Sequence, residues 1–234
     1  MAAMDRGGGG EMVEGFGGVR KPLPVVAARN RLRVGGGQVG NLPHWFSIGL
    51  VLVANASAQA VSWKIDPLHS SAQFSVRHMM ISTVRGQFGG VKGSIVYDPK
   101  NPAAATVEAT IDCSTVNTGE AKRDADLKTA EFFDVKKYPV MTFKSKHVEV
   151  EGAGKLKLTG DLTINAVTKQ VVLDLEGPTP PIKDTQGREK IGVSGETKIS
   201  RKEFGILYNP ILESGGVTVS DEVKIVLEIE LIKQ

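Results

Sequence analysis

An acid, two histidines and a phenylalanine lie close together in DPLHSSAQFSVRH, residues 66–78. Histidine is a common metal ligand and an acid or base near neutral pH, and Asp66 is an acid that could orient it. Such a site needs convergent groups that further hydrogen bonds hold in place. The chain has no HxH, HExxH or CxxC motif to supply them. The sequence therefore predicts no catalytic residue and no metal ligand.

The two histidines are expected in different places. His69 precedes a predicted strand, where a hydrogen bond to Asp66 or a nearby serine would fix the loop. His78 is in phase with Phe74 and Val76, which places it on the inner face near the strand end. There it could bond the headgroup of an amphiphile, or it could be a buried histidine satisfied by the backbone. Both readings stay open.

The elements around these residues are predicted to be strands, because apolar and polar residues alternate with a period of two from Val61 onward. Between residues 118 and 133 the spacing becomes helical or irregular. Sequential strands that each have one apolar face favour a sheet that closes on itself, because closure pairs the two edge strands of the sheet with each other. We therefore predict an all-β fold: an eight-stranded antiparallel barrel with a short helical excursion around residues 118–133. The alternation covers 72–78, 91–97, 107–113, 141–145, 156–164, 171–175, 191–199 and 223–231.

The predicted inner face carries several residues with little or no side chain. They would leave room for a ligand inside the barrel, since a packed interior prefers Val, Ile and Leu. Alternatively, the glycines only permit sharp bends. The residues are Ala72, Gly93, Ala109, Gly160 and Gly195.

Residues 1–60 read as a leader. A basic, Gly-rich segment runs into the apolar stretch 45–54 and then into Ala58-Gln59-Ala60, which fits a signal-peptidase site. We expect cleavage after Ala60 and a single domain in residues 61–234. The apolar stretch is too short for a membrane-spanning helix, which needs about 20 residues. An uncleaved anchor is the alternative.

Charge and cysteine content exclude further classes. The chain has 29 Lys and Arg against 26 Asp and Glu, and the excess lies in the leader, so the domain offers no basic patch for nucleic acid. Its one cysteine cannot form an internal disulfide in an exported chain. Cys113 alternates with inward-facing residues, which favours a buried thiol over a nucleophile.

Five segments carry a common pattern in their order and spacing: WKIDPLHSSAQFSVRHM, VRGQFGGVKGSIVYDP, DLKTAEFFDVKKYPVMTFKSKHV, LTGDLTINAVTKQVVLDLE and ISRKEFGI. Together they resemble the YceI-like family of exported polyisoprenoid-binding proteins. The resemblance implies a lipocalin-like barrel with a long apolar cavity, located in the periplasm and often dimeric, without catalytic residues or a cofactor. It also implies a polyisoprenoid, a quinone or another long-chain amphiphilic lipid as the partner; the residues identify no membrane-protein partner. Asp126, Ala166 and Gln170 depart from the family pattern.

We therefore expect non-catalytic binding, with transport or sequestration of an isoprenoid-like or quinone-like lipid. A filled barrel acting in stress response or as an interaction module is the alternative, followed by a lipid-modifying enzyme that uses His69 or His78. Phe132 and Phe133 could line the cavity or anchor the helical excursion, and two adjacent residues cannot both point inward from a strand. Arg201 could meet an acidic headgroup or form a solvated pair with Glu203. The predicted ligand-binding residues are Phe74, Val76, His78, Phe88, Phe132, Phe143, Arg201 and Phe204.

Overall fold

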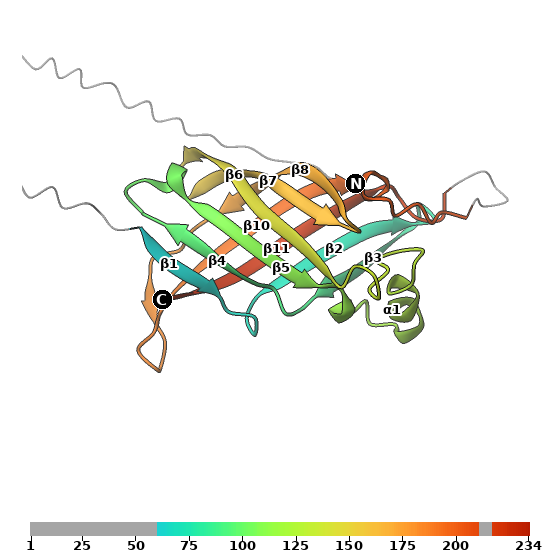
Figure 1. Ribbon diagram of the computed structural model, residues 1–234, viewed down its shortest axis with the longest axis horizontal. Helices are drawn as coiled ribbons and strands as arrows, with labels where there is room; N and C mark the ends of the chain where they lie inside the picture. Colours follow the sequence, from blue (N-terminus) through green and yellow to red (C-terminus); the bar gives the residue numbers. More distant parts are fainter. Residues whose placement is uncertain (1–59, 211–216) are drawn as a thin grey trace, which may run out of the picture. The chain divides into compact units, whose positions relative to one another are not determined.

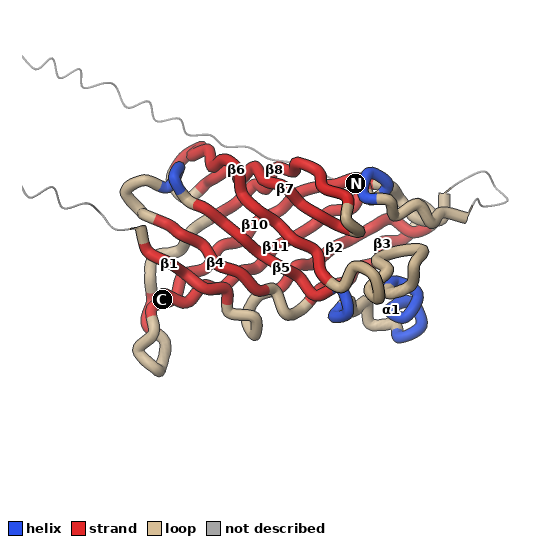
Figure 2. The backbone as a smooth tube through the Cα atoms, viewed as in Figure 1, coloured by secondary structure: helices blue, strands red, loops and turns tan. Residues whose placement is uncertain are grey.

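Strands dominate the protein. The computed structural model describes residues 60–210 and 217–234 (Figures 1 and 2). The predicted leader residues 1–59 lie outside the described residues. Among those described, no helix is long and apolar enough to cross a membrane. The strands are β1 (Val61–Ile65), β2 (Ser71–His78), β3 (Ser82–Phe88), β4 (Lys92–Tyr97), β5 (Thr106–Asp112), β6 (Val140–Gly152), β7 (Lys155–Ile164), β8 (Val167–Glu176), β9 (Ile182–Lys183), β10 (Glu189–Ser200) and β11 (Glu222–Lys233).

The sheet closes into an eight-stranded antiparallel barrel, as predicted. The closed circuit runs β1-β4-β5-β6-β7-β8-β10-β11 and returns to β1. The set of strands differs from the prediction, because β1 closes the circuit where the sequence suggested β2. Strand β2 pairs with another part of the same edge of β11, through residues 71–75, and forms a hairpin with β3. Both β1 and β3 were missed, since β1 is short and the alternation of β3 is interrupted at Gly86.

The helical excursion is smaller than the predicted range. It contains one α-helix, α1 (Ala121–Leu127), at the right-hand end of the barrel in Figure 1. The carboxylate of Glu120 caps it by accepting hydrogen bonds from the amides of Lys122 and Arg123. Thr118 instead bonds Asp124 through its amide and hydroxyl, at 2.8 and 2.6 Å. Three short 3₁₀ helices complete the elements: η1 (Pro102–Ala104), η2 (Cys113–Thr115) and η3 (Lys202–Phe204).

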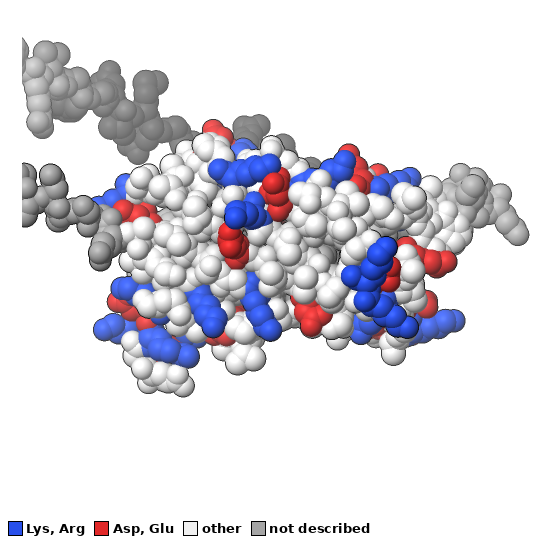
Figure 3. All heavy atoms as spheres, viewed as in Figure 1, with Lys and Arg blue, Asp and Glu red and all other residues white. Residues whose placement is uncertain are grey.

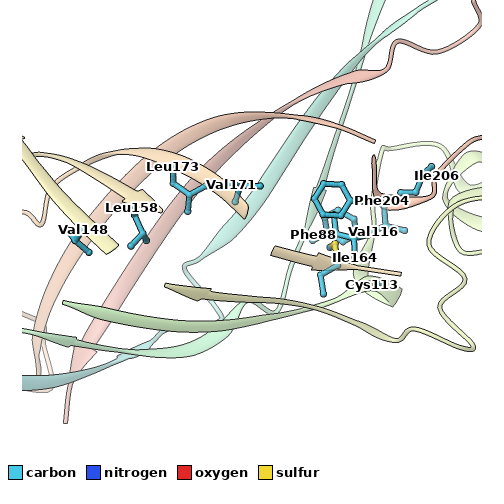
Figure 4. Packing of buried hydrophobic residues seen from close by; sticks show 11 residues of the cluster. Phe88, Cys113, Val116, Val148, Leu158, Ile164, Val171, Leu173, Phe204 and Ile206 are labelled. Atoms are coloured by element: carbon cyan, nitrogen blue, oxygen red, sulfur yellow. The ribbon is translucent and has the colours of Figure 1, made fainter. Parts of the chain in front are cut away.

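The buried residues form two clusters inside the barrel. The larger one joins aliphatic residues of β6, β7 and β8, such as Leu158 and Leu173, to a group around Phe88, Cys113 and Phe204 (Figure 4). The smaller one contains Trp63, Ile65, Ala72, Val91, Ile191 and Leu231. Cys113 is buried, and burial raises the pKa of its thiol to about 11, so it packs as a core thiol, as predicted.

Candidate functional site

An elongated cavity of about 250 Å³ runs through the barrel. Its lining includes β10 residues from Val193 to Ile199, which span roughly 20 Å of strand at 3.3 Å per residue, and Arg201 follows just beyond the strand. Residues of β11, β2, β5 and β7 face it from the other sides. The barrel is therefore hollow along much of its length rather than filled.

The chemistry of this cavity is almost entirely apolar. Of the residues that line it, only Gln73, Thr197 and Arg201 carry a polar side chain. The others are aliphatic residues, one methionine and six phenylalanines. A lining of this kind favours an apolar guest and offers few hydrogen bonds to orient one.

Most predicted site residues lie on this lining. Seven of the eight line the cavity, and His78 does not. His78 has the inward phase of Phe74 and Val76, but it lies at the last position of β2, where its backbone forms a bridge with Val219. The predicted headgroup contact of His78 therefore lacks support. The seven are Phe74, Val76, Phe88, Phe132, Phe143, Arg201 and Phe204.

The phenylalanines near α1 form one end of the cavity. Phe88 packs against Phe74, with ring centroids 5.5 Å apart, and against Phe133 edge-on at 5.2 Å. Phe132 and Phe133 both line the cavity, against the expectation that only one could point inward. They follow α1 in a turn, where the alternation of a strand does not apply. Asn165 holds this turn by donating to the Phe132 carbonyl.

The small inward residues do not all create space. A Cβ atom on Gly160 would lie 2.4 Å from the Phe143 ring, and one on Gly195 would lie 2.4 Å from Leu175. The Phe143 ring and the Leu175 side chain therefore lie over these two glycines, against the barrel wall. Ala72 and Ala109 do line the cavity. The hollow interior thus depends on the alanines and on side chains folded back over glycines.

Arg201 is the one charged residue on the described lining, and it is only 5% exposed. Its guanidinium donates to the carbonyls of Ser220 (2.9 Å), Ile206 (2.7 Å) and Val219 (3.2 Å). Burial lowers its pKa from the usual value, but a guanidinium stays charged in proteins. Within the described residues no carboxylate lies within 4.0 Å of it. The predicted alternative, a solvated pair with Glu203, is wrong because Arg201 points inward.

A second polar cluster lies away from the cavity. His69 Nδ1 is 2.9 Å from Asp66 Oδ2, the loop-fixing contact that was predicted. Buried Lys190 contacts the same carboxylate at 3.3 Å and also bonds Glu230. The hydrogen bond from His69 holds the pKa of Asp66 at about 2. Asp66, His69 and Glu230 have the spacing of a metal site, but the ammonium of Lys190 already contacts both carboxylates.

The side chains of this cluster lie outside the cavity lining. His69, His78 and Asp66 are all absent from the lining, so neither histidine of the enzyme alternative faces the cavity. The lining residues that the sequence analysis missed fall into two groups. Strand phase could have found Ile95, Leu162 and Ile225, whereas Leu127 and Val219 lie outside the strands and gave no signal.

A profile of the YceI-like domain matches residues 63–231. The chain belongs to the YceI-like family. The protein YceI of Salmonella newport (strain SL254) is 36% identical over 193 residues, which cover 81% of this chain and 96% of that protein. The match therefore includes nearly the whole relative and confirms the family resemblance.

Solved structures agree on the fold. The YceI protein of Campylobacter jejuni is 34% identical, with a TM-score of 0.55 over 68% of this chain and 90% of that one. A polyisoprenoid-binding domain from Saccharophagus degradans has a TM-score of 0.54 at 16% identity, over 74% of this chain and 99% of that one. At that identity the likeness concerns the barrel alone.

Proposed function

We propose that this YceI-like protein binds one long-chain apolar lipid inside its barrel, of isoprenoid-like or quinone-like type, without changing it chemically. The observation that carries the proposal is the long cavity with only three polar side chains on its lining. The polyisoprenoid-binding domain of Saccharophagus degradans, which has the same fold, supports the same class of ligand. The lining holds no acid or base, which favours storage or transport over catalysis.

Burial of the chain supplies the affinity. Each CH₂ group removed from water contributes about 0.8 kcal/mol, so on the order of ten groups would contribute about 8 kcal/mol before the cost of ordering. No polar contact is required for tight binding. The ligand is therefore selected mainly by the length and width of its chain, and headgroup contacts refine that choice.

The headgroup is expected near Arg201. Its three hydrogen bonds to carbonyls leave two of its five N–H groups without an acceptor among the described residues, so they are available to a ligand. A phosphate oxygen or a quinone carbonyl could accept from them, and the phosphate would also compensate the buried charge. We expect the chain to extend from Arg201 past Phe143 toward Val193.

We further propose that the protein acts in the periplasm, where a lipid must be shielded from water between membranes. The leader predicted in residues 1–60 supports this location. Expression of the full chain in an exporting bacterium should yield a periplasmic protein whose mass corresponds to a chain that starts at Val61. A full-length protein retained in the cytoplasm would contradict this part of the proposal.

Organic extraction tests the ligand class. The protein is purified without detergent from that host, extracted, and the released compounds are identified by mass spectrometry. We expect one lipid per barrel, with the mass increments of an isoprenoid chain. The proposal fails if no lipid is released and the protein also takes up neither added polyprenyl phosphate nor added quinone.

A further inference from the structure

The turn between β2 and β3 exposes apolar side chains on an unfavourable backbone. Met79 and Met80 occupy its two central positions with φ of 50° and 61°, and the amide of Ile81 bonds the His78 carbonyl at 3.1 Å. Positive φ at both positions makes this a type I′ turn, which favours Asn and Gly and disfavours bulky residues. The turn thus carries two methionines at a cost in backbone strain.

These side chains belong to a larger exposed surface. Met80 is 58% exposed and Ile81 is 78% exposed. The Met79 amide bonds the Thr218 carbonyl at 2.8 Å, and the Thr218 amide bonds the side chain of Asn209. The turn is therefore tied to a second segment that exposes apolar groups. We call this surface the apolar rim; it consists of Met79, Met80, Ile81, Leu207, Tyr208 and Val217.

The apolar rim adjoins one end of the cavity. The Tyr208 ring packs on Phe132 at 4.8 Å, and Val219 forms a backbone bridge with His78. Both Phe132 and Val219 line the cavity. In Figure 1 the end of the β2–β3 hairpin lies beside the red segment that precedes β11, at the same end as α1. The apolar rim thus adjoins the cavity end that contains Arg201, whose guanidinium bonds the carbonyls of Ile206 and Val219.

Strands β2 and β3 and the turn between them carry only positive charges. Residues 67–97 contain no Asp or Glu but carry Arg77, Arg85 and Lys92. The Arg77 guanidinium donates to the Met80 carbonyl (2.8 Å) and to Thr83 (2.9 Å), which holds it against the turn. Within the described residues neither arginine lies within 4.0 Å of a carboxylate. This differs from the intermixed charges that Figure 3 shows over the barrel wall.

We propose that the apolar rim docks the protein on a lipid bilayer with anionic headgroups. Met79, Met80 and Ile81 enter the boundary between headgroups and acyl chains, while Arg77 and Arg85 meet phosphates. Membrane docking is a property separate from the proposed lipid binding. It rests on the proposed function in one respect, namely that the bilayer supplies or receives the bound lipid. The cavity end then faces the membrane, so an apolar chain can pass between them with little exposure to water.

Vesicle flotation of the protein purified from the exporting host tests this docking. The vesicles contain phosphatidylcholine with phosphatidylglycerol, or phosphatidylcholine alone. The variant Met79→Asn/Met80→Gly suits the type I′ turn, so its thermal midpoint should be unchanged or higher. Its flotation with the anionic vesicles should fall at least about tenfold, because two apolar side chains no longer enter the interface. The parent should float better with anionic vesicles than with neutral ones.

The matched control is Leu68→Ser, which removes a side chain that is 87% exposed at the opposite end of β2. Its flotation should equal that of the parent. Docking at the rim is overturned if the double variant floats like the parent, if Leu68→Ser loses as much, or if the parent does not float. It is also overturned if the double variant dissociates a dimer while flotation is unchanged, since the rim would then join two copies of the chain.

Lipid extraction from the same samples separates this proposal from the proposed function. A parent that carries a lipid but does not float contradicts docking alone. A parent that floats but neither carries nor takes up a lipid contradicts the proposed function and leaves the docking in place.

Discussion

At the scale of single residues, Asp66 couples stability to pH. Its folded pKa is about 2 against an ordinary value of 3.8, because His69 bonds its carboxylate. The ionised form is therefore favoured by folding, and this stabilisation is present above about pH 4 and is lost as the pH falls toward 2. Lys190 adds to it through a contact with the same carboxylate oxygen, Oδ2. The cluster joins the loop before β2 to β10 and β11.

Asp66→Asn should therefore lower the free energy of unfolding at pH 7 by about 1–3 kcal/mol, the value of hydrogen bonds to a charged group. The loss should be smaller at pH 3, where the parent has begun to lose the same contribution. Urea unfolding at both pH values measures it. Asp126→Asn is the control, because it removes an exposed carboxylate without a hydrogen-bond partner among the described residues. Equal losses for both variants would contradict the role given to Asp66.

Ala166 is strained in the turn between β7 and β8. Its φ is 60° and follows a φ of 51° at Asn165, so the pair forms a turn that suits Asn followed by Gly. Ala166→Gly should raise the free energy of unfolding by about 0.5–1 kcal/mol, since glycine adopts positive φ without a steric cost. Ala121→Gly in α1 is the contrast and should destabilise by a similar amount. Destabilisation by Ala166→Gly in urea unfolding would show that the turn is not strained.

Single residues also show how far the sequence alone could go. Strand phase placed Phe74, Val76 and Phe143 on the cavity wall, because alternation depends only on the local backbone. The same phase placed His78 there, but β2 ends at that residue. Alternation does not show where a strand ends, so this misplacement could not be foreseen. The hydrogen bonds of Arg201 could not be predicted from the sequence, because its carbonyl partners belong to residues 206, 219 and 220.

At the scale of elements, the cavity depends on contacts between neighbouring strands. Phe143 on β6 lies over Gly160 on β7, where a Cβ atom would also meet the Lys144 carbonyl at 2.6 Å. The glycine therefore allows the ring to lie back against the wall. The sequence showed that Gly160 is an inward glycine, but the side chain that covers it depends on strand register, which no short pattern specifies.

Gly160→Ala should destabilise the barrel by about 1–3 kcal/mol, because the added methyl group forces the Phe143 ring from its place. The displaced ring should also enter the cavity and reduce the amount of bound lipid. Gly152→Ala on β6 is the matched control, since a Cβ atom there would meet nothing within 4 Å. Thermal unfolding and lipid extraction measure both effects. A Gly160→Ala protein with parental stability and lipid content would contradict this account of the wall.

At the scale of the whole molecule, the closed barrel was predictable and its full strand set was not. The eight long alternating segments indicated closure because each had one apolar face. Strands β1 and β3 are short and add few apolar positions. Their positions in the sheet follow from their pairing in the structure, of β1 with β4 and β11 and of β3 with β2. The cavity could not be predicted with certainty, because it depends on which large side chains fold back over glycines.

The measurement that tests the central claim most directly is native mass spectrometry of the full chain and two variants, purified without detergent. Ala109→Phe fills the cavity from β5, whereas Thr110→Phe adds the same group on the outer face of that strand. The parent and Thr110→Phe should each carry one lipid of defined mass, and Ala109→Phe should be folded but lipid-free. If all three proteins carry the same lipid, or none does even after incubation with polyprenyl phosphate or quinone, the cavity is not the binding site.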